Sequence, residues 1–220
     1  MSDPLNVITV TWNNRGLIRP WFWHLRHETR IPIRVILIDN GSNDGTLDEA
    51  LHHKQEGDLF LKMPVNIGLG LALNAATRLL YEENRNTEFF AFIESDIFLG
   101  QEDVIKDALN AIQSDEKAFM AQLKLHRTRT GKVHHGVGGS IIRMASWRQA
   151  GGFVFGYHLY NEDNEFCCAC EKFGMHRIEM QTGISLHIGG GTTIDNLGGK
   201  REMLAQEDSE MYERRHGFKP

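Results

Sequence analysis

Short apolar runs alternate with longer helix-forming segments through the first half of the chain. An apolar run bounded by turn residues predicts a strand that is covered on both faces, as in a parallel sheet. We expect strands at Asn6–Thr11, Ile33–Asp39, Leu59–Met63 and Phe89–Glu94. We expect helices at Arg15–Thr29, Leu69–Glu83 and Gln101–Ser114, and one ending near Gln55 after the N-cap candidates Asn43, Asp44 and Thr46. Successive strand–helix steps predict an α/β fold with a mostly parallel, doubly wound central sheet.

The pattern becomes mixed after Ala118. Strands are expected at Phe119–Leu125 and Gly183–Ile188, helices at Ala145–Ala150 and Glu162–Phe173, and a glycine-spaced segment at Gly136–Arg143. No internal repeat or linker divides the chain, so one domain is expected over residues 1–197. Residues 198–220 are charged and interrupted by glycine, and they predict a surface helix or a partly ordered arm.

Composition is that of an ordinary folded protein. Among the 220 residues, 41% are hydrophobic and 24% charged, with 22 Gly and 5 Pro, which excludes disordered, collagen-like and coiled-coil chains. The net charge of −5 gives no global attraction to nucleic acid or anionic lipid, so both are disfavoured as partners. The longest apolar run, Phe89–Ile93, is too short to span a bilayer, and no signal-peptide pattern is visible, so a cytoplasmic protein without a permanent membrane anchor is expected.

The three cysteines do not form a metal or disulfide pattern. Cys167, Cys168 and Cys170 are odd in number and lie too close in sequence for a disulfide framework. Adjacent cysteines on a helix point about 100° apart, and no second cluster completes a zinc site. We interpret them as small, buried apolar residues in a reducing compartment.

Two expected strands end in carboxylates, at the edge where open parallel sheets bind ligands. Asp39 ends one strand and precedes a turn, which it could equally well cap. Glu94 and Asp96 follow the next such strand, separated by Ser95. Residues two apart on an extended chain point the same way, and close carboxylates repel each other unless a cation or proton lies between them. Mg²⁺ or Mn²⁺ completed by substrate phosphates suits this ligand set.

A glycine pair also falls at a strand–helix junction. Gly68-Leu69-Gly70 lacks the third glycine of a dinucleotide-binding loop, because Leu73 stands in its place. We therefore expect Asn66 and Gly68 to shape a turn near the same strand ends.

Several segments, taken in order, resemble family 2 glycosyltransferases of the GT-A fold. Each is loose alone, whereas their order and spacing from Asn6 to His187 are specific to this superfamily. The segments are Val7-Ile8-Thr9-Val10-Thr11-Trp12-Asn13, Asp39–Thr46, Asn66-Ile67-Gly68 with Ala72 and Asn74, Glu94-Ser95-Asp96, Gly138–Arg143, Gly151-Gly152-Phe153 and Tyr160–Cys167, followed by His187.

The resemblance implies a donor half at residues 1–100 and an acceptor half at residues 101–197. It implies that Asp96 and His187 bind Mn²⁺ or Mg²⁺ on the diphosphate of a nucleotide sugar, with UDP as the expected nucleotide. The first acid of the family's D-x-D motif is Glu94 here, which leaves metal and ribose contacts as alternatives for its longer side chain. The nucleotide-binding residues implied by the resemblance are Thr11, Asn13, Asp39, Asn66, Glu94 and Ser95.

The resemblance also implies catalytic roles at the start of the last long helix. Asp163 would be the base that takes the proton of the acceptor hydroxyl, and Glu162 would orient the acceptor. A single displacement with one base implies inversion at the anomeric carbon. The alternative for both residues is ordinary acid enrichment in a first helical turn, which the helix dipole favours.

The sequence leaves the acceptor open. Saccharide, lipid-linked sugar, protein and nucleic acid all present hydroxyls, and the net charge disfavours nucleic acid. Two other functions share this fold and metal site: a sugar-phosphate nucleotidyltransferase and a non-catalytic protein that binds nucleotide sugars. The first would need a glycine-rich, basic loop after the first strand, of which Trp12-Asn13-Asn14-Arg15-Gly16 is a poor version.

Overall fold

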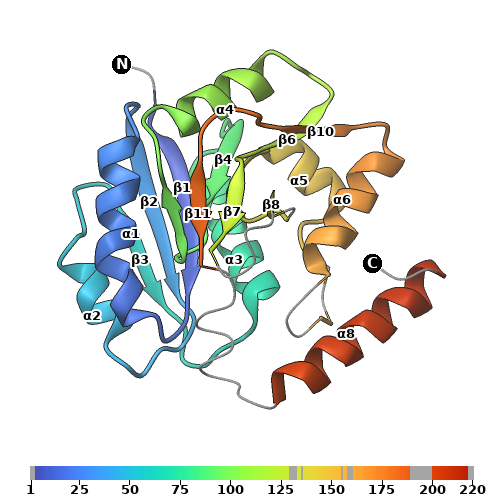
Figure 1. The fold of residues 1–220 in the computed structure, drawn as a ribbon, viewed down its shortest axis with the longest axis horizontal. Helices are drawn as coiled ribbons and strands as arrows, with labels where there is room; N and C mark the ends of the chain where they lie inside the picture. Colours follow the sequence, from blue (N-terminus) through green and yellow to red (C-terminus); the bar gives the residue numbers. More distant parts are fainter. Residues whose placement is uncertain are drawn as a thin grey trace.

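A seven-stranded sheet runs through the centre of the molecule in the order β10-β6-β9-β4-β1-β2-β3 (Figure 1). The computed structural model describes residues 3–128, 133–134, 136–154, 156–157, 161–188 and 200–217. The strands of this sheet are β1 (Leu5–Thr11), β2 (Ile33–Asp39), β3 (Leu59–Lys62), β4 (Phe89–Phe92), β6 (Ala118–Gln122), β9 (Ser140–Arg143) and β10 (His176–Glu179). Only β9 runs against its neighbours β4 and β6, while all other pairs are parallel. The predicted α/β fold with a mostly parallel sheet is therefore confirmed.

Helices cover both faces of this sheet (Figure 1). They are α1 (Arg15–Glu28), α2 (Thr46–Leu51), α3 (Leu69–Glu83), α4 (Val104–Gln113), α5 (Met144–Ala150) and α6 (Glu162–Lys172). A further helix, α8 (Lys200–His216), lies away from the sheet (Figure 1). Successive residues of a strand point to opposite faces of the sheet, and each face has its own hydrophobic core. Val7 and Val35 pack with α1 and α4 on one face, whereas Ile8 and Ile36 pack with α3, α5 and α6 on the other. This alternation explains why the strands are apolar along their whole length, because each face of the sheet is buried.

The core beneath α3, α5 and α6 also holds two of the three cysteines that were expected to be buried, and a tryptophan. Cys167 and Cys170 on α6 are buried free thiols, whereas Cys168 is only partly buried, and none of the three forms a disulfide. Trp147 is 3% exposed and its indole N–H donates to Thr77 Oγ1 at 3.0 Å. These residues therefore stabilise the packing of α5 and α6 on the sheet.

A second, four-stranded sheet was not expected from the sequence. Its strands, in the order β5-β11-β7-β8, are β5 (Ile97–Leu99), β11 (Ser185–His187), β7 (Leu125–Arg127) and β8 (Val133–His134). The strand expected at Phe119–Leu125 is divided, because the chain leaves the central sheet after Gln122 and enters the small sheet at Leu125. The small sheet carries the last expected strand as β11, adjacent to β5.

Two helices are shorter than the pattern predicts. The helix expected to reach Gln55 ends at Leu51, because the following turn is held by Asp58, which accepts hydrogen bonds from the backbone N–H groups of Gln55 at 2.8 Å and Val35 at 2.8 Å. The helix expected from Gln101 begins at Val104, after Asp103 in a left-handed conformation with φ of 64°. Polar side chains in both turns determine where the helix begins or ends.

The charged tail contains a helix that packs against α6. Helix α8 buries Tyr212, whose hydroxyl lies 3.3 Å from Cys168 Sγ. Glu165 on α6 accepts a hydrogen bond from the Tyr157 hydroxyl at 2.7 Å, and it pairs with Arg215 at 3.2 Å and His216 at 2.9 Å. The predicted surface helix is therefore anchored on its inner face. The domain boundary expected at residue 197 lies outside the described residues.

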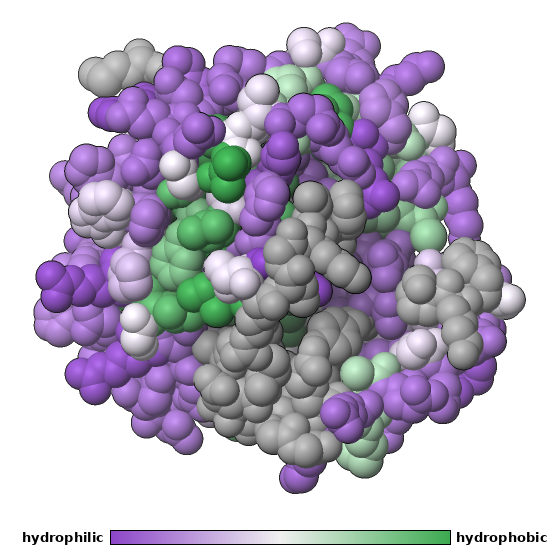
Figure 2. All heavy atoms as spheres, in the orientation of Figure 1, coloured by the Kyte–Doolittle hydropathy of each residue, from purple (hydrophilic) through white to green (hydrophobic). Residues whose placement is uncertain are grey.

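The surface in this view is largely hydrophilic (Figure 2). Apolar atoms gather over β5 and β11, where Ile184 and Leu186 are 50% and 44% exposed (Figure 2). None of the described helices has the length and apolar composition needed to cross a bilayer.

The loop after β2 packs closely against the loop after β3. Gly41 has a φ of 82°, and a Cβ at this position would lie 2.5 Å from the carbonyl carbon of Val65. Gly57 has a similar φ of 86° but open space where its Cβ would be. A side chain at either position would strain the backbone, but only a side chain at Gly41 would also overlap other atoms. Comparing the two positions therefore separates the cost of strain from the cost of overlap.

Replacing Gly41 with Ala should destabilise the protein more than replacing Gly57 with Ala. Both changes place an L-residue in the left-handed region, which costs roughly 1–2 kcal/mol. Gly41→Ala adds a clash with backbone, worth about 1–3 kcal/mol more. Urea unfolding measures both free energies, and equal losses for the two variants would contradict the described contact.

The docking of α8 should weaken in acid. Burial alone would raise the pKa of Glu165, but hydrogen bonds from Tyr157, Arg215 and His216 outweigh it and lower that pKa. Because folding lowers the pKa of Glu165, its contribution to stability is complete above the unfolded-state pKa of about 4.3. That contribution is lost as the pH falls through the lower pKa that Glu165 has in the folded protein. Hydrogen exchange of the α8 amides should therefore accelerate below about pH 4. In Glu165→Gln this acid-dependent step should be absent, and its persistence there would assign the step to another group.

Candidate functional site

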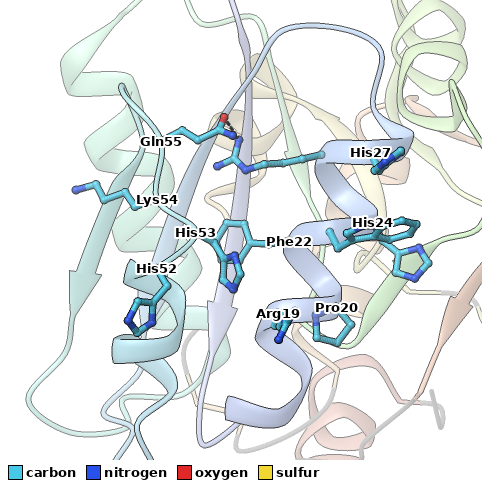
Figure 3. Close-up of a pocket in the computed structure, with 11 residues that line it drawn as sticks. Arg19, Pro20, Phe22, His24, His27, His52, His53, Lys54 and Gln55 are labelled. Atoms are coloured by element: carbon cyan, nitrogen blue, oxygen red, sulfur yellow. Dashed lines mark hydrogen bonds between the residues drawn. The ribbon is translucent and has the colours of Figure 1, made fainter.

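One large cavity lies away from the sites predicted from the sequence. It has a volume of about 740 Å³ and lies between α1 and the segment after α2 (Figure 3). Its lining is rich in basic, imidazole and aromatic side chains, including Arg19, Phe22, Trp23, His52 and Lys54. None of the sequence-predicted site residues lines it. The candidate site is therefore elsewhere, at the carboxyl edge of the central sheet.

The ends of β1 and β2 place two predicted nucleotide-binding residues side by side. Thr11 and Asp39 are partners in the parallel register of these strands, and they are 2% and 0% exposed. Asp39 Oδ1 accepts a hydrogen bond from the Ser42 N–H at 3.1 Å. Within the described part of the chain, Asp39 Oδ2 and Thr11 Oγ1 are buried without a hydrogen-bond partner. Since buried polar atoms are almost always paired, these two atoms suit contact with a bound ligand.

Asn13 joins the loop after β1 to the loop after β2. Its backbone N–H donates to Ser42 Oγ at 2.9 Å, and its side-chain oxygen accepts from the Asn43 N–H at 2.9 Å. Asn13 adopts a left-handed φ of 48°, a conformation that asparagine tolerates better than most residues. The predicted nucleotide-binding residue therefore also fixes the shape of this edge.

Asn14 extends the same network to the loop after β4, a role that the sequence analysis missed. Its N–H donates to Thr46 Oγ1 at 2.8 Å, and its side-chain amide donates to Ser95 Oγ at 2.8 Å. Asn14 and Ser95 are both buried. The predicted residue Ser95 is therefore held in place by a residue 81 positions away in sequence.

Asn66 shapes the turn after β3, as the sequence predicted. Its side-chain oxygen accepts hydrogen bonds from Asn40 Nδ2 at 3.0 Å and from the Gly68 N–H at 2.8 Å. Asn40 in turn accepts from the Ile67 N–H at 3.0 Å. Together with the Asn13 and Asn14 contacts, these bonds connect the loops that follow four parallel strands.

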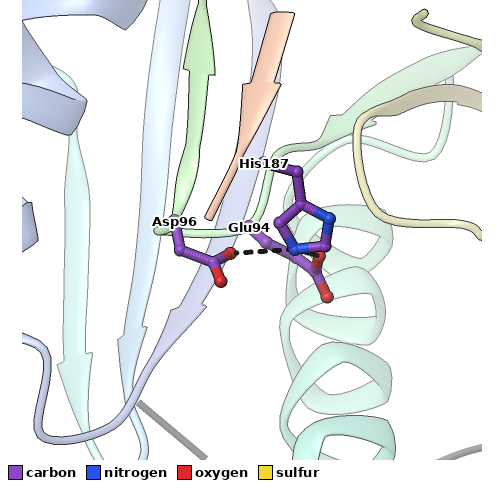
Figure 4. Close-up of side chains that lie close together, drawn as sticks. All are labelled: Glu94, Asp96 and His187. Atoms are coloured by element: carbon purple, nitrogen blue, oxygen red, sulfur yellow. Dashed lines mark ion pairs between the residues drawn. The ribbon is translucent and has the colours of Figure 1, made fainter. Parts of the chain in front are cut away.

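Glu94, Asp96 and His187 converge beside these loops (Figure 4). His187 Nε2 lies 3.5 Å from Glu94 Oε2 and 3.4 Å from Asp96 Oδ1, and one ligand atom from each residue falls within 4.8 Å of the others. Two carboxylate oxygens and one imidazole nitrogen form a ligand set that suits a divalent cation such as Mn²⁺. Within the described residues, this is the only group of three or more such side chains that meets this geometry.

The reason for this convergence differs from the one expected. Strand β4 ends at Phe92, so Glu94 and Asp96 lie in a turn closed by the Ile97 N–H, which donates to the Glu94 carbonyl at 2.9 Å. The expectation of an extended strand through Glu94 is therefore wrong, although the two carboxylates do meet. His187 reaches them because β11 pairs with β5 antiparallel, with His187 opposite Ile97.

Gly138 makes room for the longer acidic side chain. A Cβ at Gly138 would lie 2.4 Å from Glu94 Oε2 and 2.6 Å from its carboxyl carbon. No side chain larger than that of glycine fits there without displacing Glu94. The glycine-spaced segment singled out in the sequence is therefore part of the carboxylate site.

The electrostatics of this cluster favour a bound proton or cation. Burial and the neighbouring Asp96 carboxylate raise the pKa of Glu94 to about 7. Burial alone would lower the pKa of His187, but its hydrogen bond to Asp96 and the Glu94 charge raise it instead. Each shift reflects negative charge that is held close together without water, and a divalent cation would neutralise that charge.

The two carboxylates expected on the acceptor side, Glu162 and Asp163, lie at the start of α6. Burial raises the pKa of Glu162 to about 7, and the nearby charges of Asp163 and Asp208 contribute to that rise. Burial also raises the pKa of Asp163. The Asn164 N–H donates a hydrogen bond to the Asp163 carboxylate at 2.9 Å, which lowers the pKa by less than burial raises it. Asp163 acts electrostatically on Glu94, so the predicted catalytic and metal-binding carboxylates share one neighbourhood.

Arg127 is a further charged residue of this neighbourhood that the sequence analysis missed. It pairs with His187 in the parallel register of β7 and β11. Its positive charge opposes the raised pKa values of Glu94 and Asp163. No motif in the sequence marks Arg127, because its position depends on the unexpected small sheet.

Comparison with known proteins identifies the family. The sequence model of the family described as glycosyl transferase family 2 matches residues 6–181. No curated protein matches the sequence significantly.

The solved structures that share this fold include the following three, each with low sequence identity to this chain. The mannosyltransferase PcManGT from Pyrobaculum calidifontis, in complex with GDP-Man and Mn²⁺, has a TM-score of 0.69 at 16% identity, over 98% of this chain and 65% of that chain. S. aureus TarS has a TM-score of 0.68 at 16% identity, over 98% and 72% of the two chains. Glucosyl-3-phosphoglycerate synthase from Mycobacterium tuberculosis, in complex with Mn²⁺, UDP and glucosyl-3-phosphoglycerate, has a TM-score of 0.69 at 15% identity, over 99% and 81%.

The chain thus spans 65% of the length of the mannosyltransferase. At these low identities, the similarity to solved structures establishes only the fold of this chain. Its family membership is established by the match to the family model. The chain belongs to glycosyl transferase family 2, a family of enzymes that transfer sugars.

Proposed function

We propose that this protein is a metal-dependent, inverting glycosyltransferase that moves a sugar from a nucleotide diphosphate sugar, UDP-linked, to an acceptor hydroxyl. The observation that carries the proposal is the convergence of two carboxylates and an imidazole within 4.8 Å of one another. A separate, half-buried carboxylate, Asp163, acts electrostatically on the same cluster and supports it. The first group suits a cation on the donor, and the second suits a base for the acceptor.

Asp96 and His187 would hold the cation, with Glu94 as the third ligand. Their ligand atoms suit Mn²⁺ better than Mg²⁺, because Mg²⁺ prefers oxygen ligands and imidazole favours transition metals. A bound cation at this place would stabilise the negative charge that develops on the leaving diphosphate. The mannosyltransferase is solved with Mn²⁺ and the phosphoglycerate synthase with either Mn²⁺ or Mg²⁺, which supports a divalent cation here, and the ligand set favours Mn²⁺.

Thr11, Asn13 and Asp39 would contact the base and ribose of the nucleotide. The buried Oδ2 of Asp39 and Oγ1 of Thr11, unpaired within the described residues, support this role because a ligand could satisfy them. Asn66 and Ser95 would act mainly by holding the loops around the nucleotide, since their side chains bond to Asn40 and Asn14. UDP is bound by the phosphoglycerate synthase, whereas the mannosyltransferase binds GDP-Man.

Asp163 would take the proton of the acceptor hydroxyl as its oxygen forms a bond to the anomeric carbon. In the same step, the bond from that carbon to the diphosphate breaks, and UDP leaves with the electron pair. A single displacement of this kind inverts the anomeric configuration. Burial raises the pKa of Asp163, which makes its carboxylate a stronger base than an exposed aspartate. Glu162, the preceding residue, would orient the acceptor.

The two rival functions differ from this proposal in what they require. A nucleotidyltransferase would need a basic, glycine-rich loop after β1, but Asn13 and Asn14 occupy that loop and bond to the neighbouring loops. A non-catalytic protein that binds nucleotide sugars would need the donor site but not Asp163. The cytoplasmic location and the acceptor, a saccharide or another hydroxyl compound rather than nucleic acid, stay predictions.

Nucleotide binding should depend on the metal and on Asp96. Calorimetry of UDP binding with Mn²⁺ should show an affinity at least about 100-fold higher than without it, because Asp96, Glu94 and His187 would hold the cation and it would neutralise the charge of the diphosphate. Asp96→Ala should abolish this gain, since it removes a direct ligand. Asp107→Ala, which removes an exposed carboxylate on α4, should behave as the wild type. UDP binding of equal strength with and without Mn²⁺ would contradict the proposed metal role.

Sugar transfer should depend on Asp163 while donor binding does not. Asp163→Asn keeps the size of the side chain but removes the base, so turnover should fall by about 10²–10⁴-fold. Its affinity for UDP with Mn²⁺ should remain that of the wild type. The measurement is UDP release from a panel of UDP-sugars with monosaccharide acceptors.

Glu171→Gln serves as the control, because Glu171 is an exposed carboxylate near the other end of the same helix. It should turn over at the wild-type rate. Full activity of Asp163→Asn would remove this residue from the mechanism and favour another base.

A further inference from the structure

The cavity between α1 and the segment after α2 gathers basic and imidazole side chains (Figure 3). Arg19, Arg26 and Lys54 line it, together with four histidines. None of the described residues that line it is an aspartate or a glutamate, although the whole chain has a net charge of −5. The cavity is therefore a local group of cations and hydrogen-bond donors on an acidic protein.

Two of the lining side chains hold the walls of the cavity together. Arg26 on α1 forms an ion pair with Asp58, a buried carboxylate beyond α2. His53 stacks on the Phe22 ring of α1, with ring centroids 5.3 Å apart, and its Nε2 lies 3.3 Å from Glu49 Oε1. These contacts connect the two walls, and they leave Arg26 and His53 engaged with groups of the protein itself.

Four other lining side chains are exposed, and they make no hydrogen bond or ion pair in the part of the chain that the structure describes. They are Arg19 and His27 on α1, and His52 and Lys54 after α2. Lys54 Nζ lies 5.5 Å from the ring centroid of Phe60, and the ring of His27 lies 4.7 Å from that of Trp23, contacts that use none of their hydrogen-bond donors. Gathered positive groups repel one another unless an anion lies among them, so the cavity suits a negatively charged ligand.

These four groups lie at both ends of the cavity. Arg19 and His52 lie toward one end, and His27 and Lys54 lie toward the other (Figure 3). Arg19 and His27 are separated by about 12 Å along α1, from the rise of an α-helix over the residues between them. A single small anion would reach one end only, whereas a compound with several anionic groups would reach both.

We propose that this cavity binds a small, soluble compound that carries several phosphate groups. A phosphate group carries close to two negative charges and three acceptor oxygens, and the guanidinium of Arg19 matches its geometry. The cavity volume of about 740 Å³ is that of a small-molecule site. Trp23, which is 54% exposed, offers an apolar face to the rest of the compound. The site is separate from the proposed donor site, because none of the residues predicted to bind the nucleotide or the metal lines it.

The test measures the binding of tripolyphosphate by calorimetry, in EDTA so that no divalent cation takes part. We expect one tripolyphosphate per chain, with an affinity at least about tenfold higher than that of inorganic phosphate, because only the longer anion reaches both ends. Arg19→Gln and Lys54→Gln should each weaken binding about tenfold, the factor that one hydrogen bond to a charged group supplies.

The matched controls remove the same charges elsewhere. Arg78→Gln on α3 and Lys106→Gln on α4 change exposed side chains that lie outside the cavity, so both should bind tripolyphosphate as the wild type does. Because Arg19 and Lys54 are exposed and make no polar contact within the described residues, the variants at these positions should fold normally, which thermal unfolding followed by circular dichroism checks.

Two further variants separate this site from the donor site. Asp96→Ala should bind tripolyphosphate with the affinity of the wild type, since Asp96 lies outside the cavity. The double variant Arg19→Gln/Lys54→Gln should keep the Mn²⁺-dependent binding of UDP. A wild type that binds tripolyphosphate in EDTA but shows no metal-dependent binding of UDP would overturn the proposed function and support this inference.

Vesicles of phosphatidylglycerol test a membrane surface as the source of the phosphate. A hollow between two helices admits a small molecule, whereas the flat surface of a bilayer would contact only its rim, so we expect no sedimentation of the protein with the vesicles. Three results would overturn the inference. They are no binding of tripolyphosphate, binding that Asp96→Ala abolishes or that the control variants weaken as much as Arg19→Gln does, and binding to the vesicles without binding of tripolyphosphate.

Discussion

The repulsion between Glu94 and Asp96 is the constraint on which the rest of the site depends. A turn after β4 holds these carboxylates close together, and Gly138 leaves free the space that Glu94 occupies and that any Cβ at position 138 would fill. His187 approaches them from the small sheet and offers partial neutralisation. A divalent cation would complete the neutralisation, and the same cation is what a leaving diphosphate requires.

Side-chain hydrogen bonds, rather than apolar contacts, join the loops at the carboxyl edge of the sheet. Asn13 and Asn14 connect the first loop to the second and fourth, and Asn66 connects the second to the third. Such a network places the polar groups of the donor side before any ligand binds, which reduces the cost of ordering them on binding.

The sequence was sufficient wherever the pattern was long and regular. Ile33–Asp39 and Leu69–Glu83 were predicted with their correct bounds, the first from a seven-residue apolar run between turn residues and the second from fifteen residues of helix-forming sequence. The small sheet was missed because β5 and β7 have three residues each, too few for a period. Motif resemblance predicted Asp96 and His187, which the structure brings together, whereas Asn14 and Arg127 are placed by contacts between distant segments and carry no local signal.

The most direct test of the account is a crystal structure with UDP and Mn²⁺, in which anomalous scattering locates the manganese. We expect one manganese bonded to Asp96, His187 and Glu94, with the diphosphate on its far side. Asp163 should face the place where the sugar would be attached. Bound UDP with no manganese at these three residues, or manganese held elsewhere, would contradict the central claim that this cluster is the metal site of a glycosyltransferase.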